Sequence, residues 1–161
     1  MGAGYTALKL PIRDAALLKC VIGVTTMTEP SGYVSEVVKR YGRRPMPLET
    51  WEDCMGDRFR DTAVKVAISP LRNAQNIKMP VLLLHGSLDS EVFVEQSRTL
   101  WDRLAETDGE VRLVEFAGDD PYLYTTAGSA QNPADRDRRL PDEPSGGQIA
   151  TNGSHDRTVL P

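Results

Sequence analysis

The sequence predicts an α/β domain with about three parallel strands and flanking helices, followed by a disordered C-terminal tail. Short apolar runs rich in β-branched residues recur along the chain, as expected for strands buried on both faces of a parallel sheet. Amphipathic segments lie between these runs. The last 34 residues carry four prolines, alternating charges and no aromatic residue, and such a segment cannot bury enough apolar surface to order itself.

The first half of the domain is predicted to hold one strand and several helices. The apolar run within AALLKCVIGVTT (15–26) predicts a strand near residues 20–24. The segment GYVSEVVKRYG (32–42) has apolar residues at three-to-four spacing and ends in glycine, so it predicts an amphipathic helix. After it, prolines at 45 and 47 interrupt the chain, and we expect two short helices there, the second ending at Ser69 before Pro70.

The second half predicts a strand, a helix and another strand. PVLLLHG (80–86) begins with a proline that a strand start tolerates and ends in a glycine turn. From Val94 to Glu106 the apolar residues lie on one helical face, and EVRLVEF (110–116) predicts the next strand. Elements of these lengths form a right-handed crossover between parallel strands. We therefore expect one folded unit over 1–127 and a disordered polar tail over 128–161.

Composition and charge narrow the possible partners and cofactors. A net charge of −4 and a pI near 5.2 disfavour nucleic acid as a partner. No run approaches the apolar length of a transmembrane helix and no export signal is evident, so we expect no membrane association and a cytoplasmic location. Cys20 and Cys54 lack metal-ligand spacing and the only histidines are His85 and His155, so we expect no metal and no cofactor. Cys20 is expected to be buried.

Carboxylates follow two of the predicted strands, at the end of a parallel sheet where reactive groups gather. Asp89 follows the strand over 80–86, where it could form a turn or cap the next helix. Asp119 and Asp120 follow the strand over 110–116. Side chains of adjacent residues usually diverge, so we expect this pair to form a turn and not to share a proton.

Several separated motifs together resemble one known family. The segment SP (69–70), the run PVLLLHG, the D-x-x-V motif from Asp89, a helix that contains Q-S (96–97) and the loop GDDPYL (118–123) resemble, in this order, the later part of the catalytic domain of prolyl oligopeptidase-family serine peptidases. The resemblance covers roughly residues 1–124. It implies a partial α/β-hydrolase fold, with triad residues in the order Ser, Asp, His, and a peptide substrate.

The resemblance provides a match for one triad residue, the acid, and none for the serine or the histidine. Asp89 matches the triad acid, which orients a histidine and stabilises its charged form. The family's histidine falls on Pro121, whose ring cannot carry a proton. MGAGYTAL resembles the segment after the nucleophile elbow, so that the serine would fall on Met1 or before it. We expect His85 to pack beneath the loop, and Ser154 to Asp156 to form no triad.

Three readings of the function follow. The chain could be an active serine peptidase of this family, or a truncated and catalytically inactive remnant, which the missing serine and histidine favour. In the third reading it is a non-enzymatic partner module. The strand beside the missing part of the sheet would expose unpaired backbone groups, so this edge could pair with another chain or with a second copy.

Overall fold

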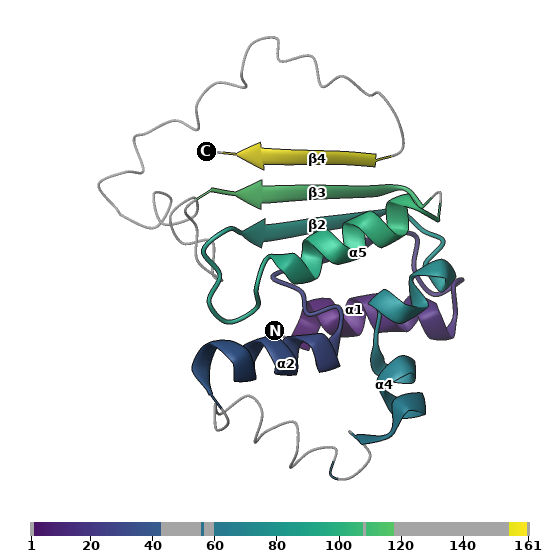
Figure 1. Ribbon diagram of the computed structural model, residues 1–161. Helices are drawn as coiled ribbons and strands as arrows, with labels where there is room; N and C mark the ends of the chain where they lie inside the picture. Colours follow the sequence, from purple (N-terminus) through teal and green to yellow (C-terminus); the bar gives the residue numbers. More distant parts are fainter. Residues whose placement is uncertain (1, 43–55, 57–59, 108, 118–154, 161) are drawn as a thin grey trace, which may run out of the picture.

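The computed structural model describes residues 2–42, 56, 60–107, 109–117 and 155–160 of the chain. This part contains four strands, and helices connect β1 to β2 and β2 to β3 (Figure 1). The elements are α1 (Gly2–Arg13), β1 (Val21–Val24), α2 (Pro30–Tyr41), α4 (Thr62–Ile68), the 3₁₀ helix η2 (Leu71–Asn76), β2 (Val81–Gly86), α5 (Glu95–Ala105), β3 (Val111–Phe116) and β4 (His155–Leu160).

The strands form one parallel sheet in the order β1-β2-β3-β4. The three strands predicted near 20–24, 80–86 and 110–116 are confirmed, as are the helices α2 and α5 and the end of α4 before Ser69. Val81 is paired with Val21 on one side and with Val111 on the other, so the first residues of three strands, all valines, lie side by side across the sheet. The α/β fold class with a parallel sheet is therefore confirmed.

The helix α1 is not predicted from the sequence. Its apolar residues Tyr5, Leu8 and Ile12 recur at helical spacing, and Leu8 is fully buried in the cluster that α1 shares with the sheet. The hydroxyl of Tyr5 donates to the carbonyl of Ile68 at 2.6 Å, which ties α1 to the end of α4. The glycines and Pro11 within α1 disfavour a helix by propensity, and burial against β1 supplies the stability.

The helix α2 begins and ends at residues that suit its two ends. Pro30 occupies the first turn, where a missing N–H costs nothing, and the carboxylate of Glu29 accepts from the backbone N–H of Gly32. At the other end Gly42 adopts a φ of 86°, in the left-handed region that favours glycine. The predicted glycine stop is confirmed.

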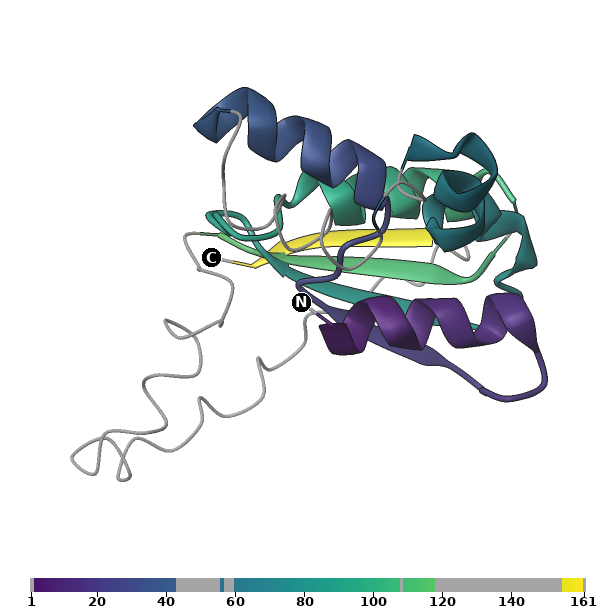
Figure 2. The ribbon, with the colours of Figure 1, turned by 90° about the horizontal axis from the view of Figure 1, so that it is seen from below.

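The main core lies between the sheet and one layer of helices. Residues of β1, β2 and β3 that alternate toward this layer are buried, and they pack against Leu8 of α1 and against Leu100 and Leu104 of α5. Figure 2 shows α2, α4 and α5 stacked on one side of the sheet. On the opposite face Ile22 and Val24 are 57% and 44% exposed, so the described helices leave this end of the sheet uncovered.

Two predictions differ from the structure. Cys20 is an exposed free thiol, because it precedes β1 and lies outside the alternation that buries Val21. Within the tail predicted to be disordered, His155–Leu160 forms β4 and pairs with β3 over six residues. Backbone pairing and ion pairs order this short segment where burial alone would not. The remainder of that prediction, at 128–154, lies outside the described residues.

Candidate active site

Asp89 lies on the turn that follows β2, at the carboxyl end of the parallel strands. Its backbone N–H donates to the carbonyl of Gly86 at 3.2 Å, which closes the turn. The residue is 5% exposed. Because ligands and reactive groups in parallel α/β sheets gather at this end, Asp89 occupies a position where a functional acid is expected.

The two carboxylate oxygens of Asp89 have different surroundings. Oδ1 accepts hydrogen bonds from the backbone N–H groups of Glu91 and Val92, both at 2.8 Å, so the turn fixes the orientation of the carboxylate. Oδ2 is buried and receives no hydrogen bond from any described residue. A buried carboxylate oxygen is costly to leave unpaired, so Oδ2 is an acceptor available to a further donor.

His85 packs beneath this turn, as the sequence predicts. It is fully buried, with Nε2 at 2.7 Å from the carbonyl of Val92 and Nδ1 at 2.7 Å from Oγ of Ser97. A carbonyl can only accept, so Nε2 carries a hydrogen and donates it to Val92. Nε2 is also 3.3 Å from Oδ2 of Asp89, but its hydrogen is directed to the shorter contact with Val92. His85 therefore supports the turn that carries Asp89 from its buried side.

Tyr33 and Phe93 form the apolar wall beside this turn. Their ring centroids are 6.3 Å apart, and Tyr33 is 1% exposed. Burial raises the pKa of Tyr33, and the carboxylates of Glu91 and Asp89 raise it further. The phenol therefore stays neutral near the acid.

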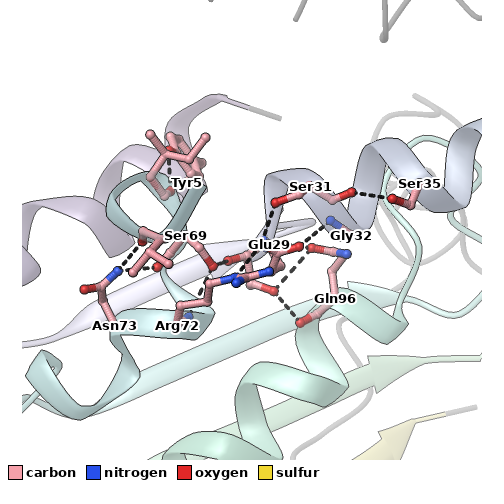
Figure 3. A network of polar contacts seen from close by, with 12 residues as sticks. Tyr5, Glu29, Ser31, Gly32, Ser35, Ser69, Arg72, Asn73 and Gln96 are labelled. Atoms are coloured by element: carbon pink, nitrogen blue, oxygen red, sulfur yellow. Dashed lines mark hydrogen bonds and ion pairs between the residues drawn. The ribbon is translucent and has the colours of Figure 1, made fainter. Parts of the chain in front are cut away.

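A second polar cluster joins the start of α2 to α5 (Figure 3). Oε1 of Gln96 accepts from the backbone N–H groups of Thr28 and Glu29 at 3.0 and 2.9 Å, and the Thr28 hydroxyl donates to the Gln96 carbonyl at 2.7 Å. The Glu29 carboxylate accepts from Nε of Arg72 at 3.1 Å and from the hydroxyl of Ser31 at 2.9 Å. These contacts fix the start of α2 relative to α5, the helix that follows the turn of Asp89.

A surface pocket of about 350 Å³ lies beside this cluster. It is lined by residues of α2, η2 and α5 and of the segments before α2 and α5: Thr28, Glu29, Gly32, Glu36, Arg40, Leu71, Phe93, Glu95, Gln96 and Thr99. Within the described part of the chain, no group of three or more His, Cys, Asp or Glu residues could hold a metal ion.

The structure describes Asp89, the predicted triad acid, and also His155 and Asp156 of the segment for which no triad is predicted. His155 begins β4 and is paired with Val111, at the amino end of the sheet. Six residues in a strand span roughly 16 Å, so His155 lies far from the turn that carries Asp89. Met1, Asp119, Asp120, Pro121 and Ser154 lie outside the described residues.

The sequence alone did not identify Ser97 or Tyr33 as parts of the site. Ser97 is fully buried and contacts a histidine 12 positions earlier in the chain, and Tyr33 belongs to a different element. Helical periodicity could have placed Tyr33 on the buried side of α2. The spacing of His85 and Ser97 carries no such signal.

A parallel sheet with a buried acid on the turn after a strand, covered by helices, agrees with an α/β-hydrolase-type domain. The model of the prolyl oligopeptidase family, Peptidase S9, matches residues 4–131. The chain belongs to this family. It is 34% identical over 84 residues to the "Uncharacterized peptidase YuxL" of Bacillus subtilis (strain 168), a match that covers 52% of this chain and 12% of that protein.

Similar solved structures agree on the fold. They include an acylaminoacyl peptidase of Pyrococcus horikoshii, with a TM-score of 0.61 and 21% identity over 76% of this chain and 19% of that chain. An acylaminoacyl peptidase in complex with Z-Gly-Gly-Phe-chloromethyl ketone has a TM-score of 0.60 and 21% identity, covering 84% and 20%. Dipeptidyl peptidase 4 of Porphyromonas gingivalis gives 0.56 and 18%, covering 79% and 18%. The chain thus spans about a fifth of these structures.

Proposed function

We propose that this chain supplies the triad acid, Asp89, of a serine peptidase catalytic domain that acts on peptides, and that the 161 residues alone do not hydrolyse them. The observation that carries the first part is the pair of environments around the Asp89 carboxylate. Oδ1 is held by two backbone donors, while Oδ2 is buried without a donor among the described residues. A triad acid needs one fixed oxygen and one that accepts from an imidazole.

The absence of hydrolysis rests on the two remaining triad roles. No G-x-S-x-G motif occurs in the 161 residues, so no serine has the sequence context of the nucleophile. The position that matches the family's histidine is Pro121, which can neither take nor give a proton. Loss of both the attacking hydroxyl and the proton shuttle removes acyl-enzyme chemistry.

The proposed substrate class follows from the family and from one relative. The family consists of peptidases, and a similar structure holds the peptidyl ligand Z-Gly-Gly-Phe-chloromethyl ketone. We propose peptides as the substrates of any assembly in which Asp89 orients a histidine.

A fluorophosphonate probe tests the absence of an activated serine. The purified chain is expected to remain unlabelled, and Asp89→Asn is expected to behave in the same way. Stoichiometric labelling that Asp89→Asn abolishes would contradict the proposed inactivity, and it would support the role of Asp89 at the same time.

Pro121→His tests the role of Asp89 separately. An imidazole that donates to Oδ2 of Asp89 is favoured in its charged form, so its pKa should be raised compared with the same imidazole in Pro121→His/Asp89→Asn. The measurement is an NMR titration of the new ring protons, which are assigned by comparison with the parent chain. Equal pKa values in the two variants would count against Asp89 as the triad acid.

A second candidate function is a non-enzymatic partner module that pairs through the edge of β1. The N–H groups of Val21 and Thr25 donate to the carbonyls of Pro80 and Leu84, so by alternation the N–H of Ile22 points away from β2. No described strand pairs with β1 on that side. We propose self-association through this edge, and a chain that elutes as a monomer at every concentration would contradict it.

We also propose a cytoplasmic location. Cys20 is a free and exposed thiol, a state that persists in reducing compartments. In the part of the chain that the structure covers, no helix is long and apolar enough to cross a membrane. Fractionation of cells that express the tagged chain tests this location, and recovery in an extracytoplasmic fraction would contradict it.

A further inference from the structure

The strand β4 is the last described strand of the chain and lies at the edge of the sheet, beside β3. It pairs in parallel with β3 from Val111↔His155 to Phe116↔Leu160, and the N–H of Ala117 donates to the carbonyl of Leu160 at 2.8 Å. The other side of β3 is already paired with β2. The edge of β3 is thus a six-residue site that accepts an extended segment through backbone hydrogen bonds.

Side chains on both faces of the sheet fix the register of this segment. On the face covered by helices, Arg157 contacts the Glu115 carboxylate at 2.8 Å. On the opposite face, Asp156 contacts Arg112 at 3.3 Å. The indole N–H of Trp101, on α5, also donates to the carbonyl of Asp156 at 3.1 Å.

A shift of one residue would reverse both charge contacts. Successive side chains of a strand point to opposite faces, so the shift would bring Asp156 to the face of Glu115 and Arg157 to the face of Arg112. Both new pairs would have like charges, which are destabilising across a sheet. The edge therefore distinguishes an acidic residue followed by a basic one from the reverse order.

Glu115, one of the two groups that contact these charges, is held in place independently of β4. The side chain of Glu115 is 2% exposed, and Arg98 of α5 binds it through two nitrogens, Nε at 3.2 Å and NH2 at 2.6 Å. By contrast, Val159 and Leu160 of the segment are 58% and 40% exposed and bury little apolar area. Selectivity is therefore concentrated at positions 156 and 157.

We propose that the edge of β3 is a strand-addition site that recognises an extended peptide with an acidic residue followed by a basic one, and that residues 155–160 of this same chain occupy it. The site is separate from the turn that carries Asp89, and it does not depend on the proposed peptidase role. By filling this edge, the chain's own segment excludes other extended peptides of the same charge order.

The test uses full-length chains whose own segment is released. In the first chain Asp156→Arg and Arg157→Asp exchange the two charges and leave the net charge unchanged. In the second, Thr158→Pro removes a backbone donor. The carbonyl of Leu160 faces β3, so by alternation the N–H of Thr158 does too, while that of Val159 points outward. Val159→Pro is the matched control.

Each chain is titrated against two fluorescent peptides, SHDRTVL and the charge-exchanged SHRDTVL, and binding is followed by anisotropy. Both released chains are expected to bind SHDRTVL saturably and about tenfold more tightly than SHRDTVL, since two charge contacts distinguish the peptides. The parent and Val159→Pro chains should bind SHDRTVL at least about tenfold more weakly, because their own segment competes. The two released chains are independent, so misfolding of one leaves the other as the test.

Three results would overturn the proposal. If folded released chains bind neither peptide, the edge is not a strand-addition site. Equal affinity for the two peptides would exclude recognition of charge order. A parent dimer that SHDRTVL dissociates in analytical ultracentrifugation would show that the segment comes from a second copy and not from the same chain.

Discussion

The dipeptide Gln96–Ser97 shows how neighbouring residues on one helix serve different parts of the site. Gln96 accepts from the backbone before α2 and so holds that helix against α5, whereas Ser97 contacts His85 beneath the acid's turn. His85 also donates to the carbonyl of Val92. The two neighbouring residues of α5 therefore support both the apolar wall of Tyr33 and Phe93 and the loop that carries Asp89. Rigid supports of this kind keep a functional carboxylate in a single orientation.

Glu115 is the buried acid on which two arginines converge. Burial alone would raise the pKa of Glu115, but hydrogen bonds and charges from Arg98 and Arg157 outweigh it and lower the pKa below its ordinary value of 4.5. A lowered pKa in the folded state means that the folded state binds this proton more weakly than the unfolded chain. The resulting stability is present above about pH 4.5 and is lost as the pH falls through the folded-state pKa.

Glu115→Gln is therefore expected to lower the free energy of unfolding at pH 7 by about 2 kcal/mol, because two partly exposed arginines lose their buried partner. The difference from the parent should shrink as the pH falls below about 4.5, where the unfolded chain takes up this proton, and it should be lost as the pH falls through the folded-state pKa. Urea unfolding at several pH values between 7 and 3.5 measures both effects.

The matched control is Glu36→Gln. Glu36 also has a lowered pKa, through a hydrogen bond from Arg40, but that pair is exposed to solvent on α2. Surface pairs of this kind contribute little. Parallel stability curves for the parent and Glu115→Gln across the acid range would refute the assigned role of Glu115.

Among the elements, α1 depends on a close approach to the segment after β1. A Cβ built on Gly4 would lie 3.1 Å from Cβ of Thr26 and closer still to its hydroxyl oxygen, and Thr26 is fully buried. Glycine is needed here because the helix and the segment share this space, although alanine is the better helix former. Propensity and packing thus make opposite predictions for the same substitution.

Gly4→Ala should destabilise the chain by about 1–3 kcal/mol, the usual cost of overpacking, instead of stabilising it through helix propensity. Thr26→Ala removes the hydroxyl oxygen, which the new methyl group would meet most closely, and Cγ2. In the double variant the cost of Gly4→Ala should therefore largely disappear, and thermal or urea unfolding of the four chains gives the coupling free energy. Additive effects of the two substitutions would contradict the proposed contact.

For the molecule as a whole, the two edges of the sheet differ. One end carries β4, which covers the edge of β3, while at the other end β1 has no described strand beside it. Ile22 and Val24 are exposed near this open edge, on the face that the described helices leave uncovered. Unpaired backbone groups next to exposed apolar residues favour association with another strand.

Ile22→Lys should lower self-association, because a charged side chain at an open edge disfavours pairing with another strand. Light scattering or sedimentation over a concentration series is expected to show a smaller weight-average mass than the parent at equal concentration. Val66→Lys places the same charge on α4, at a residue that is 40% exposed and away from the edge, and should leave the mass unchanged. If both variants lower the weight-average mass equally, the change results from net charge and not from the edge.

The sequence by itself determined the parallel strands near 20–24, 80–86 and 110–116, the helices α2 and α5, and the position of Asp89 after a strand. These features are local, because a buried strand, an amphipathic helix and a glycine stop each leave their own periodic or compositional signal. Tertiary structure alone decided the rest. The helix α1, the bracing of Asp89 by His85 and Ser97, and the seating of residues 155–160 on β3 depend on contacts between residues distant in sequence, whose energies no local pattern records.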